Sequence, residues 1–335
     1  MLPKRAFIIC FTLLVSLLSS SAMTVAQSCS TCTNSQFEAS SSSSWSTSAK
    51  REAWTIYKRV DEVMVFFTVR KGHKFVTDLT AAEVKVQDDH KSVGKLSSFG
   101  RQTDLPLRLG LLVDTSDSVA YRMRFEKDVS RDFLKTVVRR GMDQAFVMGF
   151  SLQTTLTADY TDDHRQLASA VSALRSGGNT ALFDALVQVC EMLAGGETDG
   201  GPVARVLVVL SDGDDNSSKT TLEEAIEFAQ RRDVTIYSIS TNDSENAQAG
   251  DAIMNRLGVE TGGRMFRPQT DWGMMDAFSQ IDREMHSRYS LSYRLSDLVE
   301  DGRYHGIDIT AERSHKRLRV DARKGYYAPL AMSAN

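Results

Sequence analysis

Residues 107–118 read LRLGLLVDTSDS, an apolar run that ends directly in Asp, Thr and Ser side chains. Residues 206–215, VLVVLSDGDD, repeat this pattern a hundred residues later in the chain. Nearly continuous apolar runs of this length are typical of parallel strands that are buried on both faces. Both stretches therefore predict central strands of a parallel sheet, each followed at once by a polar loop.

The region from residue 104 to residue 288 alternates apolar strands with segments of helical periodicity. The predicted strands are 107–113, 145–150, 206–210 and 234–240. The predicted helices are 123–138, 164–174, 181–193, 221–232, 249–257 and 272–285. This alternation predicts an α/β fold, a doubly wound and mostly parallel sheet sandwiched by helices.

Short β-rich runs flank this region on both sides. They cover residues 63–69, 83–87 and 92–99 before it, and 289–295, 305–311 and 317–321 after it. Neither group has enough strands to bury a sheet face alone. We therefore expect the flanks 54–103 and 289–328 to pair as a second, small β domain, with the α/β domain 104–288 inserted between them and 329–335 as a tail.

The N-terminal residues 1–26 have the layout of a signal peptide. Two basic residues precede an apolar run at 6–18, and small residues follow. That run is short for a membrane span, and no later stretch approaches about 18 uninterrupted apolar residues. We expect a mature protein without a membrane span, secreted to the periplasm or outside the cell; a retained N-terminal anchor is the alternative. The Ser-rich segment 27–53 is predicted to be a disordered linker.

Three cysteines remain beyond the predicted signal peptide. Cys29 and Cys32 can close a small disulfide in an oxidising compartment, with lipidation of Cys29 as the alternative. Cys190 falls in a helical pattern and is predicted to be a small buried hydrophobe. The net charge of −3 provides no basic excess, so we do not expect nucleic acid as a partner.

Oxygen-bearing side chains follow the predicted central strands. Asp114, Ser116 and Ser118 come after one strand, Asp212 comes after another, and Thr180 directly precedes a predicted helix. In open parallel sheets, ligands bind beyond the carboxyl ends of the strands, where such loops converge. Hydroxyl and carboxylate oxygens are hard ligands that suit Mg²⁺, or alternatively Mn²⁺ or Ca²⁺. The five residues therefore predict a divalent metal site.

Each of these segments has a simpler interpretation when taken alone. Asp and Ser after a strand are common helix caps, and a Gly-Gly-Asn-Thr run or an acidic stretch is a common turn. Their joint occurrence at strand ends favours the metal site. The neighbouring Asp117, Asp214 and Asp215 are interpreted as solvated loop charges.

The pattern Asp114-x-Ser116-x-Ser118, followed by Thr180 and then Asp212, resembles the metal-ion-dependent adhesion site (MIDAS) of von Willebrand factor type A (VWA) domains. The resemblance covers residues 105–288. It implies that the three hydroxyl residues contact the metal, while one or both aspartates act through water.

The flanks in turn resemble a bacterial family of secreted VWA-related proteins, through VTDLT at 76–80 and RKGYY at 323–327. One departure is the turn at 88–91, DDHK, where a glycine is expected in that family.

We therefore expect a metal-dependent protein-binding or adhesion module, not an enzyme, that grips an Asp or Glu carboxylate of a protein partner. One alternative is a metal-assisted hydrolase that uses the same aspartates. Against it, the chain has no nucleophile elbow, phosphate-binding loop or paired-His motif, and no histidine in the site loops. The other alternative is a structural assembly factor with a vestigial metal site.

Overall fold

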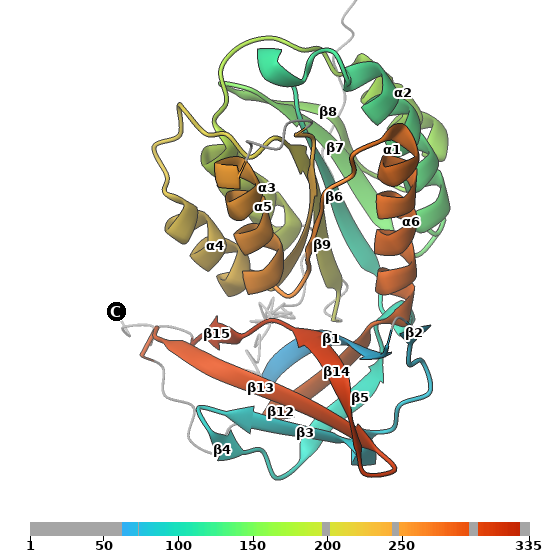
Figure 1. The fold of residues 1–335 in the computed structure, drawn as a ribbon, viewed down its shortest axis with the longest axis vertical. Helices are drawn as coiled ribbons and strands as arrows, with labels where there is room; N and C mark the ends of the chain where they lie inside the picture. The colour runs from blue at the N-terminus through green and yellow to red at the C-terminus, as the bar shows by residue number, and fades with distance from the viewer. Residues whose placement is uncertain (1–61, 73, 196–201, 243–247, 295–300, 329–335) are drawn as a thin grey trace, which may run out of the picture. The chain divides into compact units, whose positions relative to one another are not determined.

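The computed structural model describes residues 62–72, 74–195, 202–242, 248–294 and 301–328 (Figure 1). The predicted signal peptide, linker and tail, together with Cys29 and Cys32, lie outside these residues. The described residues form two sheets, and both sheets belong to one compact unit, Lys58–Asn335. None of the described helices combines the length and the apolar character that a membrane span needs.

The first sheet has six strands within the described residues, in the order β11-β10-β9-β6-β7-β8. Every neighbouring pair is parallel except β7 with β8, which is antiparallel. Its strands are β6 (Leu107–Asp114), β7 (Gln144–Phe150), β8 (Thr154–Thr161), β9 (Ala204–Ser211), β10 (Val234–Ser240) and β11 (Met265–Phe266). All four predicted strands are therefore present.

Helices cover both faces of this sheet, with α1, α2 and α6 on one side and α3, α4 and α5 on the other (Figure 1). They are α1 (Met123–Val137), α2 (His164–Ala173), α3 (Leu182–Gly195), α4 (Leu222–Arg231), α5 (Gln248–Glu260) and α6 (Asp271–Ser287). Each matches a predicted helix. Cys190 is fully buried in α3, as predicted.

Strand β6 is buried along its whole length because it serves both layers of the core. Leu109, Leu111 and Val113 belong to the apolar cluster that packs with α1, α2 and α6. Leu112, which points to the opposite face, belongs to the cluster that packs with α3, α4 and α5. The uninterrupted apolar sequence of this strand is the direct consequence of burial on two faces.

Two strands of this sheet have no counterpart among the predicted ones. Strand β8 is an edge strand whose residues are exposed or half-buried, so it lacks the apolar signal of its neighbours. Strand β11 has only two residues. Both are held by backbone pairing to β7 and β10, which an apolar pattern does not reveal.

The second sheet is built from both flanks, so their predicted pairing is confirmed. Strand β1 pairs antiparallel with β12 and β14, and β13 pairs antiparallel with β3. The strands are β1 (Glu62–Lys71), β2 (Lys74–Phe75), β3 (Val84–Asp88), β4 (Lys91–Ser92), β5 (Leu96–Arg101), β12 (Tyr289–Arg294), β13 (Tyr304–Arg313), β14 (Lys316–Ala322) and β15 (Gly325–Tyr327). The single strand predicted at 92–99 is wrong, because β4 ends at Ser92 and β5 begins at Leu96.

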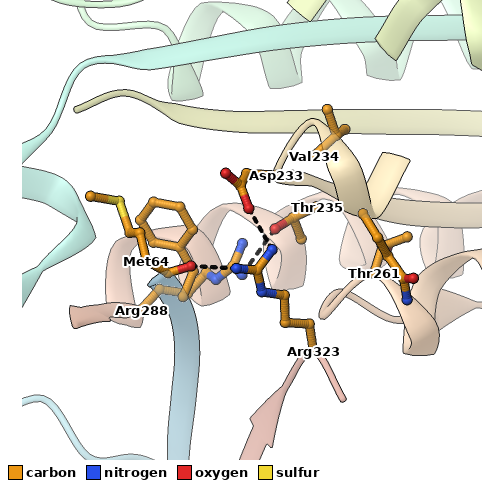
Figure 2. Close-up of a pocket in the computed structure, with 9 residues that line it drawn as sticks. Met64, Asp233, Val234, Thr235, Thr261, Arg288 and Arg323 are labelled. Atoms are coloured by element: carbon orange, nitrogen blue, oxygen red, sulfur yellow. Dashed lines mark hydrogen bonds and ion pairs between the residues drawn. The ribbon is translucent and has the colours of Figure 1, made fainter. Parts of the chain in front are cut away.

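Two buried arginines join the two sheets (Figure 2). Arg323, from the second sheet, pairs with Asp233 and donates to the backbone oxygen of Met64, 2.6 Å away. Arg288 is only 1% exposed, and it donates to the Thr235 hydroxyl across 3.1 Å. The cavity among these side chains encloses only ≈ 10 Å³, room for about one water molecule. Arg288 and Arg323, with Asp233, Thr235 and Met64, therefore form a closely packed contact between the two sheets, called the joint below.

The joint provides a test of how the two sheets hold together. Replacing Arg323 by Gln removes a buried charge-assisted contact, and we expect it to lower the free energy of unfolding by about 2 kcal/mol. Arg319→Gln is the matched control, because that side chain is 72% exposed and its ion pair with Asp321 is worth little. Urea titration monitored by circular dichroism measures both variants. An equal decrease in the free energy of unfolding of the two variants would show that the Arg323 contact does not stabilise the joint.

Candidate metal centre

The centre begins with the parallel pairing of β6 and β9. In this register Val113 lies opposite Leu210, so both strands reach the same edge of the sheet together. Asp114 ends β6 and Ser211 ends β9. The Ser211 hydroxyl donates to Oδ2 of Asp114 across 2.7 Å. The two loops are thus tied together at their first residues.

A chain of hydrogen bonds continues from Asp114 across the two loops. Its Oδ1 accepts from the backbone N–H of Ser116 across 2.8 Å. The Ser116 and Ser118 hydroxyls lie 3.0 Å apart, and Ser118 donates to Oδ2 of Asp212 across 2.7 Å. The structure therefore brings four of the five predicted residues into one hydrogen-bonded group.

Thr180, the fifth predicted residue, lies in a loop that is anchored to both site loops. The backbone N–H of Asp117 donates to the carbonyl oxygen of Gly178 across 3.2 Å. On the other side, the N–H of Thr180 donates to Oδ1 of Asn216 across 3.1 Å. The loop that carries Thr180, which is buried, is thus fastened to the loop after β6 and to the loop after β9.

The Asp212 loop requires glycine at the next position. Gly213 has a φ of +81°, and a Cβ there would lie 2.3 Å from the backbone oxygen of Gly250 in α5. Asn242, after β10, donates from its side chain to the backbone oxygen of Asp212 across 2.7 Å. The loop therefore lies directly against α5 and is held in one position. Asn242, like Ser211 and Asn216, supports the site without having been predicted from the sequence.

Burial shapes the electrostatics of the centre. It raises the pKa of Asp114 to about 6, with a further increase from the neighbouring charge of Asp212 and an opposing effect from the Ser116 and Ser211 hydrogen bonds. The pKa of Asp214, an exposed residue, is also raised, first by partial desolvation of its carboxyl group and then by the charge of Asp212. A site that holds several carboxylates with little water becomes more stable when a cation enters it.

A further carboxylate, Glu126 of α1, lies in the field of these aspartates. It is 1% exposed, and neither of its side-chain oxygens has a hydrogen-bond partner among the described residues. Burial raises its pKa to about 8, Arg122 opposes this increase, and Asp114 and Asp212 add to it. An orphaned buried carboxylate beside two others fits a nearby divalent cation. A sequence signal existed, because Glu126 interrupts the apolar face of its helix.

One of the acidic loop residues has a structural role that was not predicted. Asp117 and Asp214 are exposed, as expected for solvated charges. Asp215 is half-buried, and its Oδ2 accepts from the backbone N–H of Phe183 across 3.0 Å and from the Ser218 hydroxyl across 2.6 Å. Asp215 therefore caps the first turn of α3, and its interpretation as a solvated charge was wrong.

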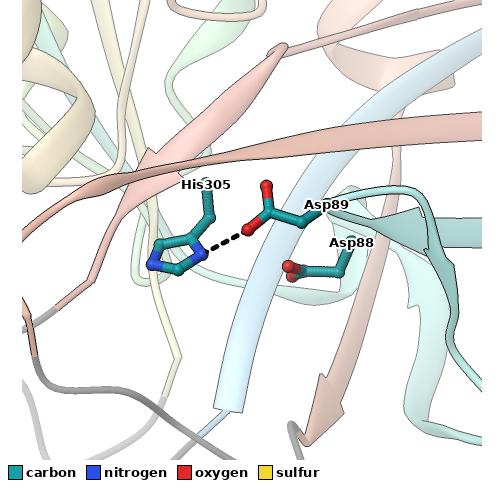
Figure 3. Close-up of side chains that lie close together, drawn as sticks. All are labelled: Asp88, Asp89 and His305. Carbon is teal, nitrogen blue, oxygen red and sulfur yellow. Dashed lines mark hydrogen bonds and ion pairs between the residues drawn. The ribbon is translucent and has the colours of Figure 1, made fainter.

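The described residues contain another cluster with metal-ligand chemistry, in the second sheet (Figure 3). The ligand atoms of Asp88, Asp89 and His305 lie within 4.8 Å of one another. Asp88 is already satisfied, because its Oδ2 accepts from the Tyr293 and Tyr326 hydroxyls across 2.7 and 3.1 Å. Nδ1 of His305 lies 2.7 Å from Asp89. This cluster fastens the turn after β3 to the start of β13.

The family model described as von Willebrand factor type A domain matches residues 109–280, just over half of the chain. No curated protein sequence matches the chain.

Three solved structures illustrate the structural likeness. A von Willebrand factor type A protein from Catenulispora acidiphila has 10% identity and a TM-score of 0.48, over 79% of this chain and 76% of that one. The vWF domain of the type V pili tip protein Mfa5 from Porphyromonas gingivalis has 11% identity and a TM-score of 0.45, over 53% and 94%. The PilB minor pilin from Streptococcus sanguinis has 14% identity and a TM-score of 0.43, and the match covers 55% of this chain and 62% of the pilin.

The His305 cluster predicts a pH dependence of stability. Burial of the ring opposes its charge, but the hydrogen bonds with Asp89 and Asp301 outweigh it and raise the pKa of His305 above 6.5. The backbone N–H of Gly306 and then the His305 ring lower the pKa of Asp89 below 3.8. The raised pKa of His305 contributes stability that is fully present below about pH 6.5. The lowered pKa of Asp89 contributes stability that is fully present above about pH 4.

We therefore expect His305→Gln to lower the melting temperature most between about pH 4 and 6.5, and less as the pH rises through the folded-state pKa of His305. His315→Gln, at a fully exposed position, is the control and should leave the profile unchanged. A destabilisation by His305→Gln that stays constant from pH 4 to pH 9 would contradict the ionic contribution.

Proposed function

This chain belongs to the von Willebrand factor type A domain family, and we propose that it is a protein-binding module that acts through a divalent cation. In this proposal Asp114, Ser116, Ser118, Thr180 and Asp212 hold Mg²⁺ or Mn²⁺, and a carboxylate of the partner completes the coordination. The observation that carries the proposal is the hydrogen-bonded chain from Asp114 to Asp212.

The donor set supports a hard cation. Three hydroxyl residues and two carboxylates from three separate loops supply only oxygen, the ligand type that Mg²⁺, Mn²⁺ and Ca²⁺ prefer. Hydroxyls that now hydrogen-bond to one another still carry lone pairs that can turn to an ion. If the aspartates act through water, the ion's direct protein ligands are neutral. Its charge is then under-compensated, and a partner's carboxylate is a favourable last ligand.

The surface beside the site offers space for a partner. A groove of ≈ 360 Å³ runs between the loop after β7 and the start of α3. It is lined by Ala181, which directly follows Thr180, and by the exposed side chain of Leu152. A partner that places a carboxylate on the cation can rest its neighbouring residues in this groove. Both contacts together would provide more affinity than the carboxylate alone.

The enzyme alternative lacks a base or a nucleophile. Hydrolysis at a metal needs a group that moves protons near neutral pH, most often histidine. The site loops at 114–118, 177–181 and 211–216 contain no histidine. Asp114 and Glu126, whose pKa values are raised to about 6 and 8, are both buried and only about 1% exposed. We therefore propose a binding function without turnover.

The setting we propose for this function is outside the cytoplasm. The N-terminal charge and apolar pattern of a signal peptide supports export, after which the binding site would meet partners in the periplasm or beyond. In this proposal the flanks form a β domain that supports the metal-binding domain, while residues 27–53 act as a tether.

Metal binding is the first test. We expect titration calorimetry to show one Mg²⁺ or Mn²⁺ bound per chain, and about 2.7 kcal/mol of added stability at 100 times the dissociation constant. Asp114→Ala should abolish the binding, because it removes a buried site carboxylate. Asp117→Ala, at an exposed position in the same loop, is the control and should bind normally. Well-folded wild-type protein that binds no divalent ion would refute the proposal.

Thr180→Ala tests the role of the third loop. We expect it to weaken metal-dependent partner binding by about 2 kcal/mol, roughly thirtyfold, while the fold stays intact. The partner is first captured from the native envelope with Mg²⁺ and released by chelator, and its affinity is then measured with purified protein. The control is Thr221→Ala, which removes the N-cap of α4 and costs about 1 kcal/mol of stability without touching the site. Unchanged affinity of folded Thr180→Ala protein would rule out this mechanism.

A further inference from the structure

Glu126 is a buried charge with no role in the site as assigned above. It lies on the face of α1 that carries Met123, Val129 and Phe133 into the apolar core. Both carboxyl oxygens are buried and lack hydrogen-bond partners among the described residues. A carboxylate in such surroundings costs several kcal/mol unless a proton or a cation compensates it. Within the described part of the chain, no side chain or backbone group supplies that compensation by a hydrogen bond.

Hydrogen bonds place the start of α1 beside the metal centre. Arg122, one turn before Glu126 on the same helix, donates from Nη1 to the backbone oxygen of Thr241 across 2.8 Å. Thr241 follows β10, and the next residue, Asn242, donates from its side chain to the backbone oxygen of Asp212 across 2.7 Å. This part of α1 is therefore fastened to the same edge of the sheet as the site aspartates. In agreement, Arg122 lowers the pKa of Glu126, whereas Asp114 and Asp212 raise it.

We propose that Glu126 is a third carboxylate of the metal centre, a positioning residue that accepts hydrogen bonds from water around the bound cation. This inference rests on the proposed metal-binding function. Outer carboxylates that orient the surroundings of a metal commonly change metal affinity by about 10 to 100-fold. The first helix after the site loop then contributes to the centre as well as to the core.

The proposal has a consequence for protons. With its pKa raised to about 8 by burial and by the two aspartates, Glu126 carries a proton at neutral pH when no cation is bound. A cation favours the ionised carboxylate, so binding should transfer that proton from the carboxyl group to the buffer. Comparison of the wild type with a Glu126 variant isolates the proton that Glu126 contributes, because the other site residues are the same in both proteins.

The test is Mg²⁺ calorimetry at pH 7 in buffers of different ionisation enthalpy. We expect the wild type to release close to one proton more than Glu126→Gln, and the variant to bind Mg²⁺ about tenfold more weakly at pH 8. Because the metal-free carboxyl group is already neutral at pH 7 and has no hydrogen bond to lose among the described residues, the amide should leave the metal-free variant about as stable as the wild type. Ser130→Ala is the matched control, because Ser130 is an equally buried, unpartnered side chain one turn along α1.

Two further measurements keep the outcome decisive. Glu126→Asp retains a carboxylate and should restore proton release and part of the affinity. If Glu126→Gln does not fold, carbon-13 NMR of the carboxyl groups of the wild type tests the inference instead. One glutamate is expected to titrate near pH 8 without Mg²⁺ and at lower pH with Mg²⁺.

Absence of Mg²⁺ binding by the wild type would defeat the proposed function itself. The inference alone is overturned if the wild type binds Mg²⁺ while Glu126→Gln matches it in affinity and proton release. It is also overturned if the NMR titration of Glu126 is insensitive to Mg²⁺.

Discussion

The parallel pairing of β6 with β9 is the constraint on which the rest of the site depends. Because the two strands run in the same direction and in register, Asp114 and Ser211 arrive at one edge although 97 positions separate them in the chain. The loops that follow must then leave the sheet side by side. Ser118 meets Asp212 for this reason, and a shift of one residue in the register, about 3.3 Å along the strand, would break the contact between Ser211 and Asp114. The core on both faces of β6 is what holds the register.

The same edge concentrates negative charge that the fold does not neutralise. Asp114, Asp212 and Glu126 are all buried, and the basic side chain of Arg122 lowers the pKa of Glu126. Hydrogen bonds from serine hydroxyls satisfy Asp114 and Asp212 in part, whereas the Glu126 carboxyl group accepts none from the residues that the structure describes. An arrangement that would be unfavourable for stability alone is suited to a ligand that carries positive charge. The large apolar core makes such a local cost tolerable.

The second sheet meets the α/β layer at the opposite ends of the strands. Arg288 and Arg323 contact Asp233 and Thr235, at the start of β10, whereas Asp114 and Asp212 follow the carboxyl ends of β6 and β9. The joint therefore lies at the opposite edge of the α/β sheet from the candidate metal centre. Because β1 and β12 pair directly, the sequence before the α/β region and the sequence after it are brought together, and the inserted region is held at both of its ends.

The sequence by itself determined the α/β layer, the pairing of the flanks and the identity of the oxygen-bearing loops. The first and the last rest on local patterns, such as the apolar run of β6 or the helical spacing of α1, which follow from burial of a given face. The pairing of the flanks rests on strand number, because neither flank has enough strands to bury a sheet face alone. Edge strand β8, the break between β4 and β5, the capping role of Asp215 and the orphaned Glu126 were decided only by the tertiary structure. Burial and hydrogen-bond partners at these positions depend on residues far away in the chain, as Asp215 depends on Phe183 and Glu126 on Asp212. The sequence alone does not distinguish a carboxylate that faces water from one that caps a helix or lies in a core. Only the residues that surround it in space decide which of these roles it takes.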